Sequence, residues 1–133
     1  MQLLMQVGLV ALGSAVGGVT RWGVGWAAAR FLGAAFPFGT LLINVSGSFF
    51  LGWFLTVLGE RSDGRLFGLG ADGLRLAVAV GFTGAFTTFS TFEWESHELL
   101  RDGDGLAATV YMFGSLLLGL AAVRLGMLLA RYV

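Results

Sequence analysis

Four long stretches without a charged residue constrain this chain more than any other feature. They cover residues 1–20, 31–59, 76–92 and 105–123, and each is long enough for a helix to cross about 30 Å of hydrocarbon. Hydrophobic residues make up 56% of the chain and charged residues only 12%, whereas soluble domains average about 25% charged residues. We therefore predict an all-α membrane protein with four transmembrane helices, built by residues 1–133 as a single domain.

The net charge and the lack of cysteine exclude several classes of function. Eight basic and eight acidic residues give a net charge of zero, so the basic face that binds nucleic acid is missing. The chain has no cysteine, which excludes disulfides and thiolate metal sites. The first apolar stretch lacks a positive leader and exceeds the roughly 7–15 residues of a signal peptide core, so we expect it to be retained. These features predict a multi-pass protein of the cell (inner or plasma) membrane.

The helix boundaries follow from the polar residues between the apolar stretches. We expect Arg21 to end the first helix and Thr40 to cap the second, with a first loop over Gly23–Gly39. Residues 60–75 collect charges among glycines and predict a surface loop. The four predicted helices are about Leu3–Thr20, Thr40–Leu58, Leu76–Glu95 and Leu106–Val123.

The arginines divide almost evenly between the two sides of the membrane that four crossings define. The side with the termini and the second loop holds five and the other side three; these are Arg61, Arg65, Arg75, Arg124 and Arg131 against Arg21, Arg30 and Arg101. Arginine-rich loops stay cytoplasmic, so such a weak difference allows insertion in both orientations. Two inverted copies then build a pseudo-symmetric assembly. We predict an antiparallel, dual-topology homodimer in the lipid bilayer.

Glycine is unusually frequent, with 22 residues. Small residues four apart let helix backbones approach closely in lipid, so we interpret most of them as packing positions. The small-residue series are Gly13/Gly17, Ser48/Gly52, Ala77/Gly81/Ala85 and Ser115/Gly119.

The third apolar stretch places glycines and hydroxyls at membrane depth. We expect the helix to break near Gly84, between Gly81 and Thr87, which frees backbone carbonyls that a buried cation satisfies. The simpler alternative is a kinked but continuous helix whose threonines bond the carbonyl four residues back.

Phenylalanine recurs every third residue in this stretch, at Phe86, Phe89 and Phe92. A ring has a positive edge, so rings flanked by hydroxyls suit a small dehydrated anion without a full charge. Asn44 and Tyr111 add donors from other helices. Each residue also has a structural explanation: core packing for the rings, and interhelical hydrogen bonding for the amide and hydroxyls. For Arg21 the structural explanation is snorkelling to the interface.

Three motifs together closely resemble the fluoride channel family called Fluc or CrcB. They are Gly17-Gly18-x-x-Arg21, Gly39-Thr40-Leu41-Leu42-Ile43-Asn44 and Gly84-Ala85-Phe86-Thr87-Thr88-Phe89-Ser90-Thr91-Phe92. The resemblance spans all four predicted helices. It implies a passive, selective fluoride exporter that is not an enzyme. It also implies a dual-topology dimer with two antiparallel pores and a central structural sodium ion.

The resemblance assigns roles to particular residues. Backbone carbonyls of Gly84 and Thr87 from each chain would hold the sodium. The fluoride pore would use Asn44, Thr88, Phe89, Ser90, Phe92, Tyr111 and Ser115. Arg21, Thr40 and Glu95 would serve the vestibule and its structure.

Two other functions remain open at this point. A small proton-coupled exporter needs an ionisable residue at mid-membrane, and residues 1–20 and 76–92 supply none. A non-conducting membrane scaffold would explain the glycines but not the polar third stretch.

Overall fold

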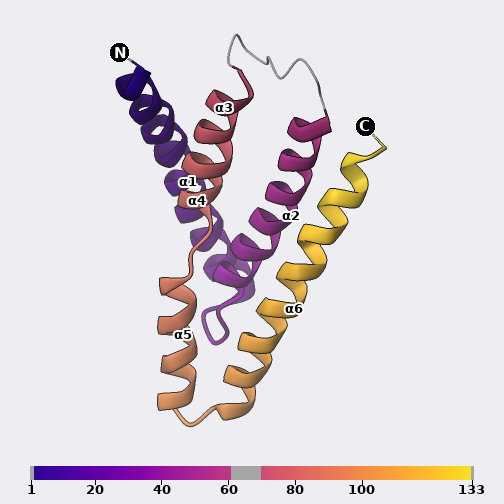
Figure 1. Cartoon of the computed structure of the whole chain (residues 1–133). Coiled ribbons are helices and arrows are strands. Elements are labelled where there is room, and N and C mark those ends of the chain that lie inside the picture. The colour runs from indigo at the N-terminus through magenta and orange to yellow at the C-terminus, as the bar shows by residue number, and fades with distance from the viewer. Residues whose placement is uncertain (1, 61–69, 133) are drawn as a thin grey trace.

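The computed structural model describes residues 2–60 and 70–132, and every regular element in this part of the chain is a helix. The start of α1, the end of α2 and the end of α6 lie at one end of the molecule, and α5 lies at the other (Figure 1). The elements are α1 (Gln2–Leu32), α2 (Phe38–Glu60), α3 (Ala71–Leu74), the π-helix η1 (Arg75–Thr83), α4 (Gly84–Phe86), α5 (Ser90–Arg101) and α6 (Gly105–Ala130).

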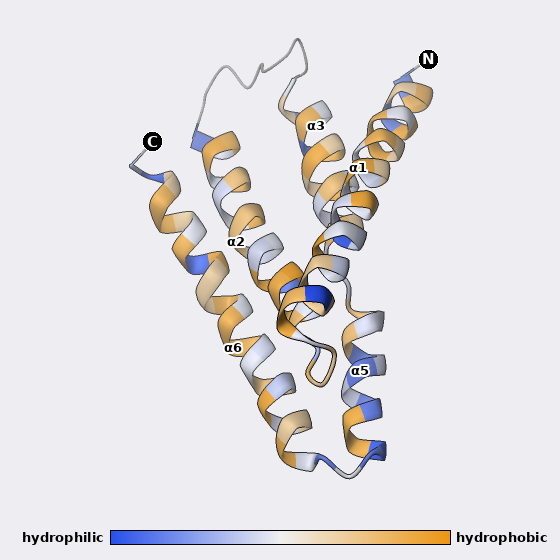
Figure 2. Cartoon of the chain, turned by 180° about the vertical axis from the view of Figure 1, so that it is seen from behind, coloured by the Kyte–Doolittle hydropathy of each residue, from blue (hydrophilic) through white to orange (hydrophobic). Residues whose placement is uncertain are grey.

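Three of the helices, α1, α2 and α6, are long and apolar enough to cross a membrane. Hydrophobic residues dominate their length, whereas hydrophilic residues gather on α5 (Figure 2). The chain is therefore a multi-pass membrane protein, as predicted. The remaining predicted crossing is composed of several shorter elements, α3 to α5.

Several predicted helix boundaries are wrong, and the last helix, α6, ends at Ala130 rather than near Val123. The first helix does not end at Arg21: α1 continues to Leu32, so the residues between it and α2 are 33–37 rather than Gly23–Gly39. Gly33 has a φ of +85°, a left-handed conformation suited to glycine, and this residue follows the last helical one. Aromatic and basic residues at a membrane boundary are compatible with helix, so the helix persists until this glycine.

Thr40 is not an N-cap, because α2 begins at Phe38 and Thr40 lies within its first turn. Its hydroxyl bonds another helix instead, as described below. Asp104 does cap α6, since its side chain accepts a hydrogen bond from the Ala107 N–H at 3.0 Å. The predicted polar loop over residues 60–75 is too long, because α2 includes Glu60 and α3 begins at Ala71 and leads directly into η1 at Arg75. Residues 61–69 of that loop lie outside the described residues.

The third stretch is helical through Gly84 and departs from helix one turn later. Gly84 has φ −63° and ψ −35°, both helical, whereas Thr87 is extended with ψ 159°. The non-helical residues are therefore 87–89, not 81–87 as expected. The side chain of Asn44 in α2 hydrogen-bonds the backbone of Thr88. This contact, rather than the flexibility of glycine, sets where the helix is interrupted.

The helices pack in two close pairs, α1 with η1 and α2 with α6. A Cβ atom at Gly13 or Gly17 would collide with backbone carbonyls of Ala77 and Phe82 in η1. In the second pair, a Cβ at Gly52 would collide with the Val123 carbonyl. The predicted packing role is confirmed for these glycines and for Gly81, which faces Val10 and Gly13; Gly126, which faces Phe49 in α2, was not predicted.

We predict that Gly17→Ala destabilises the protein relative to Gly18→Ala. Both changes improve intrinsic helix propensity equally, but only the Gly17 methyl group meets backbone, whereas nothing lies within 4 Å of a Cβ at Gly18. Overpacking of this kind costs about 1–3 kcal/mol. The midpoint of thermal unfolding in detergent measures the difference, and equal midpoints for the two variants would contradict the packing assignment.

Candidate functional site

The non-helical residues 87–89 are held by a side chain from α2. The Asn44 Oδ1 accepts a hydrogen bond from the Thr88 N–H at 2.8 Å, and the Asn44 Nδ2 donates to the Thr88 carbonyl at 2.9 Å. One amide therefore satisfies both backbone polar groups of Thr88, which the interrupted helix leaves unpaired. The second N–H of Nδ2 remains for another acceptor.

This pairing frees a carbonyl on the preceding helical turn. In a continuous α-helix the Thr88 N–H would bond the Gly84 carbonyl, but Asn44 takes it instead. The Thr87 carbonyl accepts from Arg21 Nη1 at 3.4 Å. The Thr87 N–H and hydroxyl both donate to the Thr83 carbonyl, at 3.0 and 2.9 Å. The interruption thus presents backbone oxygens without regular helical partners.

A cavity of about 300 Å³, here called the Phe89 cavity, adjoins this segment. Phe89 and Phe92 lie on it with ring centroids 6.1 Å apart and planes inclined at 41°, and Phe89 is 74% exposed in the single chain. None of the described residues that line it is charged. They are Asn44, Gly47, Ser48, Leu51, Thr83, Thr87, Thr88, Phe89, Phe92, Ser115 and Leu116.

One buried hydroxyl in the Phe89 cavity has no hydrogen-bond partner among the described residues. The Ser115 Oγ is buried and makes no hydrogen bond with the described part of the chain. A buried polar group left unpaired costs about 1–3 kcal/mol, so such an atom calls for an explanation. An ion or water in the cavity would satisfy it.

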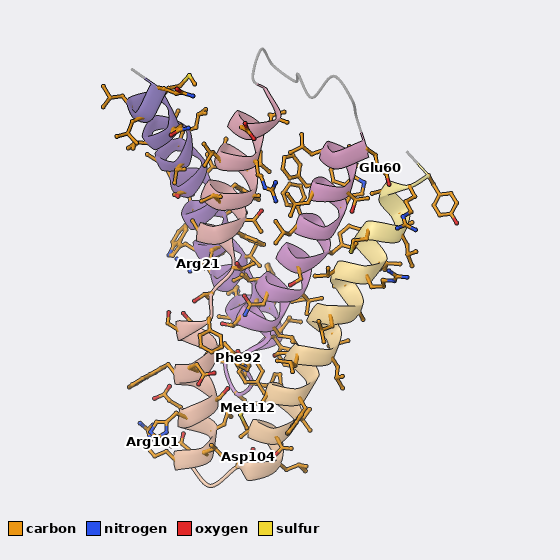
Figure 3. All side chains as sticks on the ribbon, in the orientation of Figure 1. Arg21, Glu60, Phe92, Arg101, Asp104 and Met112 are labelled. Carbon is orange, nitrogen blue, oxygen red and sulfur yellow. The ribbon has the colours of Figure 1, made fainter. Side chains whose placement is uncertain are left out.

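A second cavity of about 530 Å³, here called the Arg21 cavity, lies between α1, the residues after it, the start of α2, and α5. Its polar and charged lining residues are Arg21, Thr40, Thr88, Thr91, Glu95, Glu98 and Asp102. Thr88 lines both cavities, so the two adjoin at the non-helical segment. Figure 3 labels Arg21 and Phe92, which mark the two sites.

Glu95 connects three helices at the edge of the Arg21 cavity. Its Oε1 accepts from the Thr40 hydroxyl of α2 at 2.9 Å, and its Oε2 accepts from the Tyr111 hydroxyl of α6 at 2.7 Å. Thr40 and Tyr111 are both buried. Neutral donors therefore stabilise a carboxylate that lies among helices, and no cation of residues 2–60 and 70–132 forms an ion pair with it.

The structure brings most of the predicted site residues together. Arg21, Thr40 and Glu95 share the Arg21 cavity. Asn44, Thr88, Phe89, Phe92 and Ser115 share the Phe89 cavity.

Three predicted site residues line neither cavity: Tyr111, Ser90 and Gly84. Tyr111 lines neither cavity, because its hydroxyl donates to Glu95 and its ring packs against Phe92 at 5.1 Å. Ser90 is exposed at the start of α5 and lines neither cavity. Phe86 is buried and stacks on Phe82, so the interruption separates it from the other two phenylalanines.

Sequence reasoning missed two polar residues of the Phe89 cavity, Thr83 and Ser48; the Thr83 hydroxyl donates to the Val78 carbonyl of its own helix at 3.0 Å. Ser48 was interpreted only as a packing residue with Gly52, yet it lines this cavity. Its spacing of four residues from Asn44 places both on one face of α2, and this signal was available in the sequence.

Comparison with known proteins adds an independent finding. Residues 8–127 match the family model of "CrcB-like protein, Camphor Resistance (CrcB)". The chain is 43% identical to "Fluoride-specific ion channel FluC" of Solibacter usitatus, over 92% of this chain and 96% of that protein. Proteins of the same name from Chloroflexus aurantiacus and Rhizobium etli are 44% and 40% identical, over 92% and 96% of this chain and 93% and 98% of theirs. The chain therefore belongs to the CrcB family.

Proposed function

We propose that this chain is a passive, fluoride-selective ion channel that exports fluoride across the membrane and so relieves fluoride toxicity. Its similarity to proteins named as fluoride-specific channels supports this proposal. The observation that carries it is the chemistry of the Phe89 cavity, where aromatic rings, an amide and hydroxyls surround a space that no described residue lines with a charge.

This lining suits a small anion that has lost its water. The edges of Phe89 and Phe92 carry partial positive charge, and the second Asn44 N–H and the unpaired Ser115 hydroxyl are donors. Together they replace the hydration of fluoride with several weak interactions. A lysine or arginine at the same place would hold the anion too tightly for conduction, which needs binding weak enough to release the ion.

The two cavities define a route. The Arg21 guanidinium lies in the Arg21 cavity and would attract anions there. The acidic side chains of the same lining are engaged: Glu95 accepts from the Thr40 and Tyr111 hydroxyls, and Glu98 and Asp102 form ion pairs with Arg101. Thr88 lies on both cavities, so an ion that passes Asn44 and Thr88 reaches the aromatic rings. No step needs a protonation or a conformational cycle, so the gradient sets the direction of flux.

The proposal includes an antiparallel homodimer with two pores. In one chain Phe89 is 74% exposed and Gly84 is also exposed, although both belong to the segment with the channel chemistry. A second copy covering this face would enclose them. The near balance of arginines between the two sides is compatible with insertion in both orientations.

A structural sodium ion at the dimer centre is part of the same proposal. Sodium is a hard cation and prefers oxygen ligands. In the described residues no group of three or more His, Cys, Asp or Glu side chains is placed to bind a metal, so the ligands would be backbone oxygens. The Gly84 carbonyl without its helical donor fits this role, and the Thr87 carbonyl keeps a second lone pair beside its bond with Arg21.

The competing functions have less support. A proton-coupled exporter needs an ionisable group on its substrate site, and the described lining of the Phe89 cavity has none. A non-conducting scaffold needs only the glycine contacts and leaves the unpaired Ser115 hydroxyl without a purpose.

The proposed function predicts a specific ion flux from liposomes that contain the purified protein. We expect rapid fluoride efflux, followed by a fluoride electrode, without chloride efflux. Phe89→Ile and Phe92→Ile should slow fluoride efflux about fivefold or more, because each removes a ring-edge interaction of about 1 kcal/mol. Phe31→Ile is the matched control, since Phe31 lies at the end of α1 and lines neither cavity.

Unchanged efflux in both Phe89→Ile and Phe92→Ile would contradict the assigned route. Absence of fluoride efflux from well-folded wild-type protein would contradict the function itself and leave the glycine-packed architecture standing.

The proposed sodium site predicts how much sodium the purified protein retains. Wild-type protein passed through a sodium-free column should retain about one sodium per two chains in elemental analysis, because oxygen ligands from both copies enclose it. Asn44→Ala should lower this content, since the Thr88 N–H is then free to return to the Gly84 carbonyl. Equal sodium content in wild-type and unfolded protein would rule out the proposed site.

A further inference from the structure

We propose that Ser48 is a fluoride-binding residue, and that its hydroxyl and that of Ser115 form an anion subsite between α2 and α6. This inference rests on the proposed channel function and extends it to a residue outside the motifs that identify the family. It depends on three observations: the position of Ser48, the state of its hydroxyl, and the open space beside it.

Ser48 continues the polar face of α2 that begins at the non-helical segment. Asn44 and Ser48 are four residues apart on the same helix face, and both line the Phe89 cavity. Leu51 is the next residue of α2 on that lining. An ion that leaves the Asn44 amide along α2 therefore meets the Ser48 hydroxyl as the next polar group of this helix.

The Ser48 hydroxyl differs from its neighbours on α2 in being available. The Ser46 Oγ donates to the Leu42 carbonyl at 2.6 Å, and the Thr56 Oγ1 donates to the Gly52 carbonyl at 2.8 Å. These are the local bonds that satisfy hydroxyls in membrane helices. In the described part of the chain, Ser48 makes no such bond, and the Ser115 Oγ across the cavity makes none either.

The space beside Ser48 is open because α6 has a glycine there. A Cβ atom built at Gly119 would lie 3.7 Å from the Ser48 Oγ, at ordinary van der Waals contact, and would meet no other atom within 4 Å. The Ser48 hydroxyl thus faces the backbone of α6 one turn beyond Ser115. Two hydroxyls from facing helices, each with a free proton, suit an anion that accepts short hydrogen bonds.

A purely structural role for Ser48 predicts a different response to mutation. As a small residue paired with Gly52, Ser48 would be replaceable by alanine, which is smaller and favours helix. As an anion ligand it would not be, because only the hydroxyl carries the proton that fluoride accepts. Fluoride efflux and thermal stability, measured on the same variants, therefore distinguish a packing role of Ser48 from a role as anion ligand.

The test measures fluoride efflux from liposomes and the thermal midpoint in detergent for the same variants. Ser48→Ala is expected to slow efflux about tenfold, as for loss of a hydrogen bond to a charged group, with an unchanged midpoint. Ser46→Ala is the control, since that hydroxyl is bonded to its own helix and lines neither cavity. Ser48→Cys keeps the size with a weak donor and should also slow efflux.

A rescue experiment that measures fluoride efflux gives a result that a structural role of Ser48 would not produce. Gly119→Ser introduces a hydroxyl where there is room for it, so it should restore efflux in the Ser48→Ala background, whereas Gly119→Ala should not. Wild-type efflux in both Ser48→Ala and Ser48→Cys would overturn the inference, and so would equal rescue by Gly119→Ala. Failure of the channel function is a separate result, because wild-type protein would then release no fluoride.

Discussion

The pairing of the Asn44 amide with the backbone of Thr88 is the interaction on which the rest of the site depends. Two hydrogen bonds of 2.8 and 2.9 Å replace the helical partners of Thr88, so the third stretch can depart from helix inside an apolar protein without leaving these groups unpaired. The same bonds remove the helical donor of the Gly84 carbonyl. They also join α2 to the segment where the two cavities adjoin. The Asn44 side chain thus holds a non-helical segment whose backbone oxygens lie close to the aromatic rings and hydroxyls of the Phe89 cavity.

The glycine contacts make this pairing possible. Lipid tails are as apolar as leucine, so helices in a membrane associate through close packing rather than through the hydrophobic effect. Gly13 and Gly17 let α1 approach the backbone of η1, and Gly52 and Gly126 do the same between α2 and α6. Gly47 lies directly against Thr87 and Phe86, so a side chain there would push α2 away from the non-helical segment. Small residues therefore position the polar ones.

The charged side chains lie at the edge of the site, on the Arg21 cavity. The carboxylate of Glu95 is held by the hydroxyls of Thr40 and Tyr111, which ties α2, α5 and α6 together with neutral donors. Arg21 lies in the same outer cavity, where Glu98 and Asp102 form ion pairs with Arg101, while the described lining of the Phe89 cavity is uncharged. This division supports the proposed function, since attraction at an entrance and weak binding beyond it are both needed for conduction.

The amino-acid pattern alone is enough to predict a membrane protein, its helical class and most of the candidate site residues. Apolar length and the lack of charge allow only helices that satisfy their own backbone, and spacings of four residues marked the glycine contacts at Gly13 and Gly17. The tertiary structure alone decided where the helix is interrupted, that Tyr111 serves Glu95, and that Ser48 faces the cavity. These outcomes depend on which atoms of distant helices meet. A local pattern states which groups need partners, but only packing in three dimensions selects the partner.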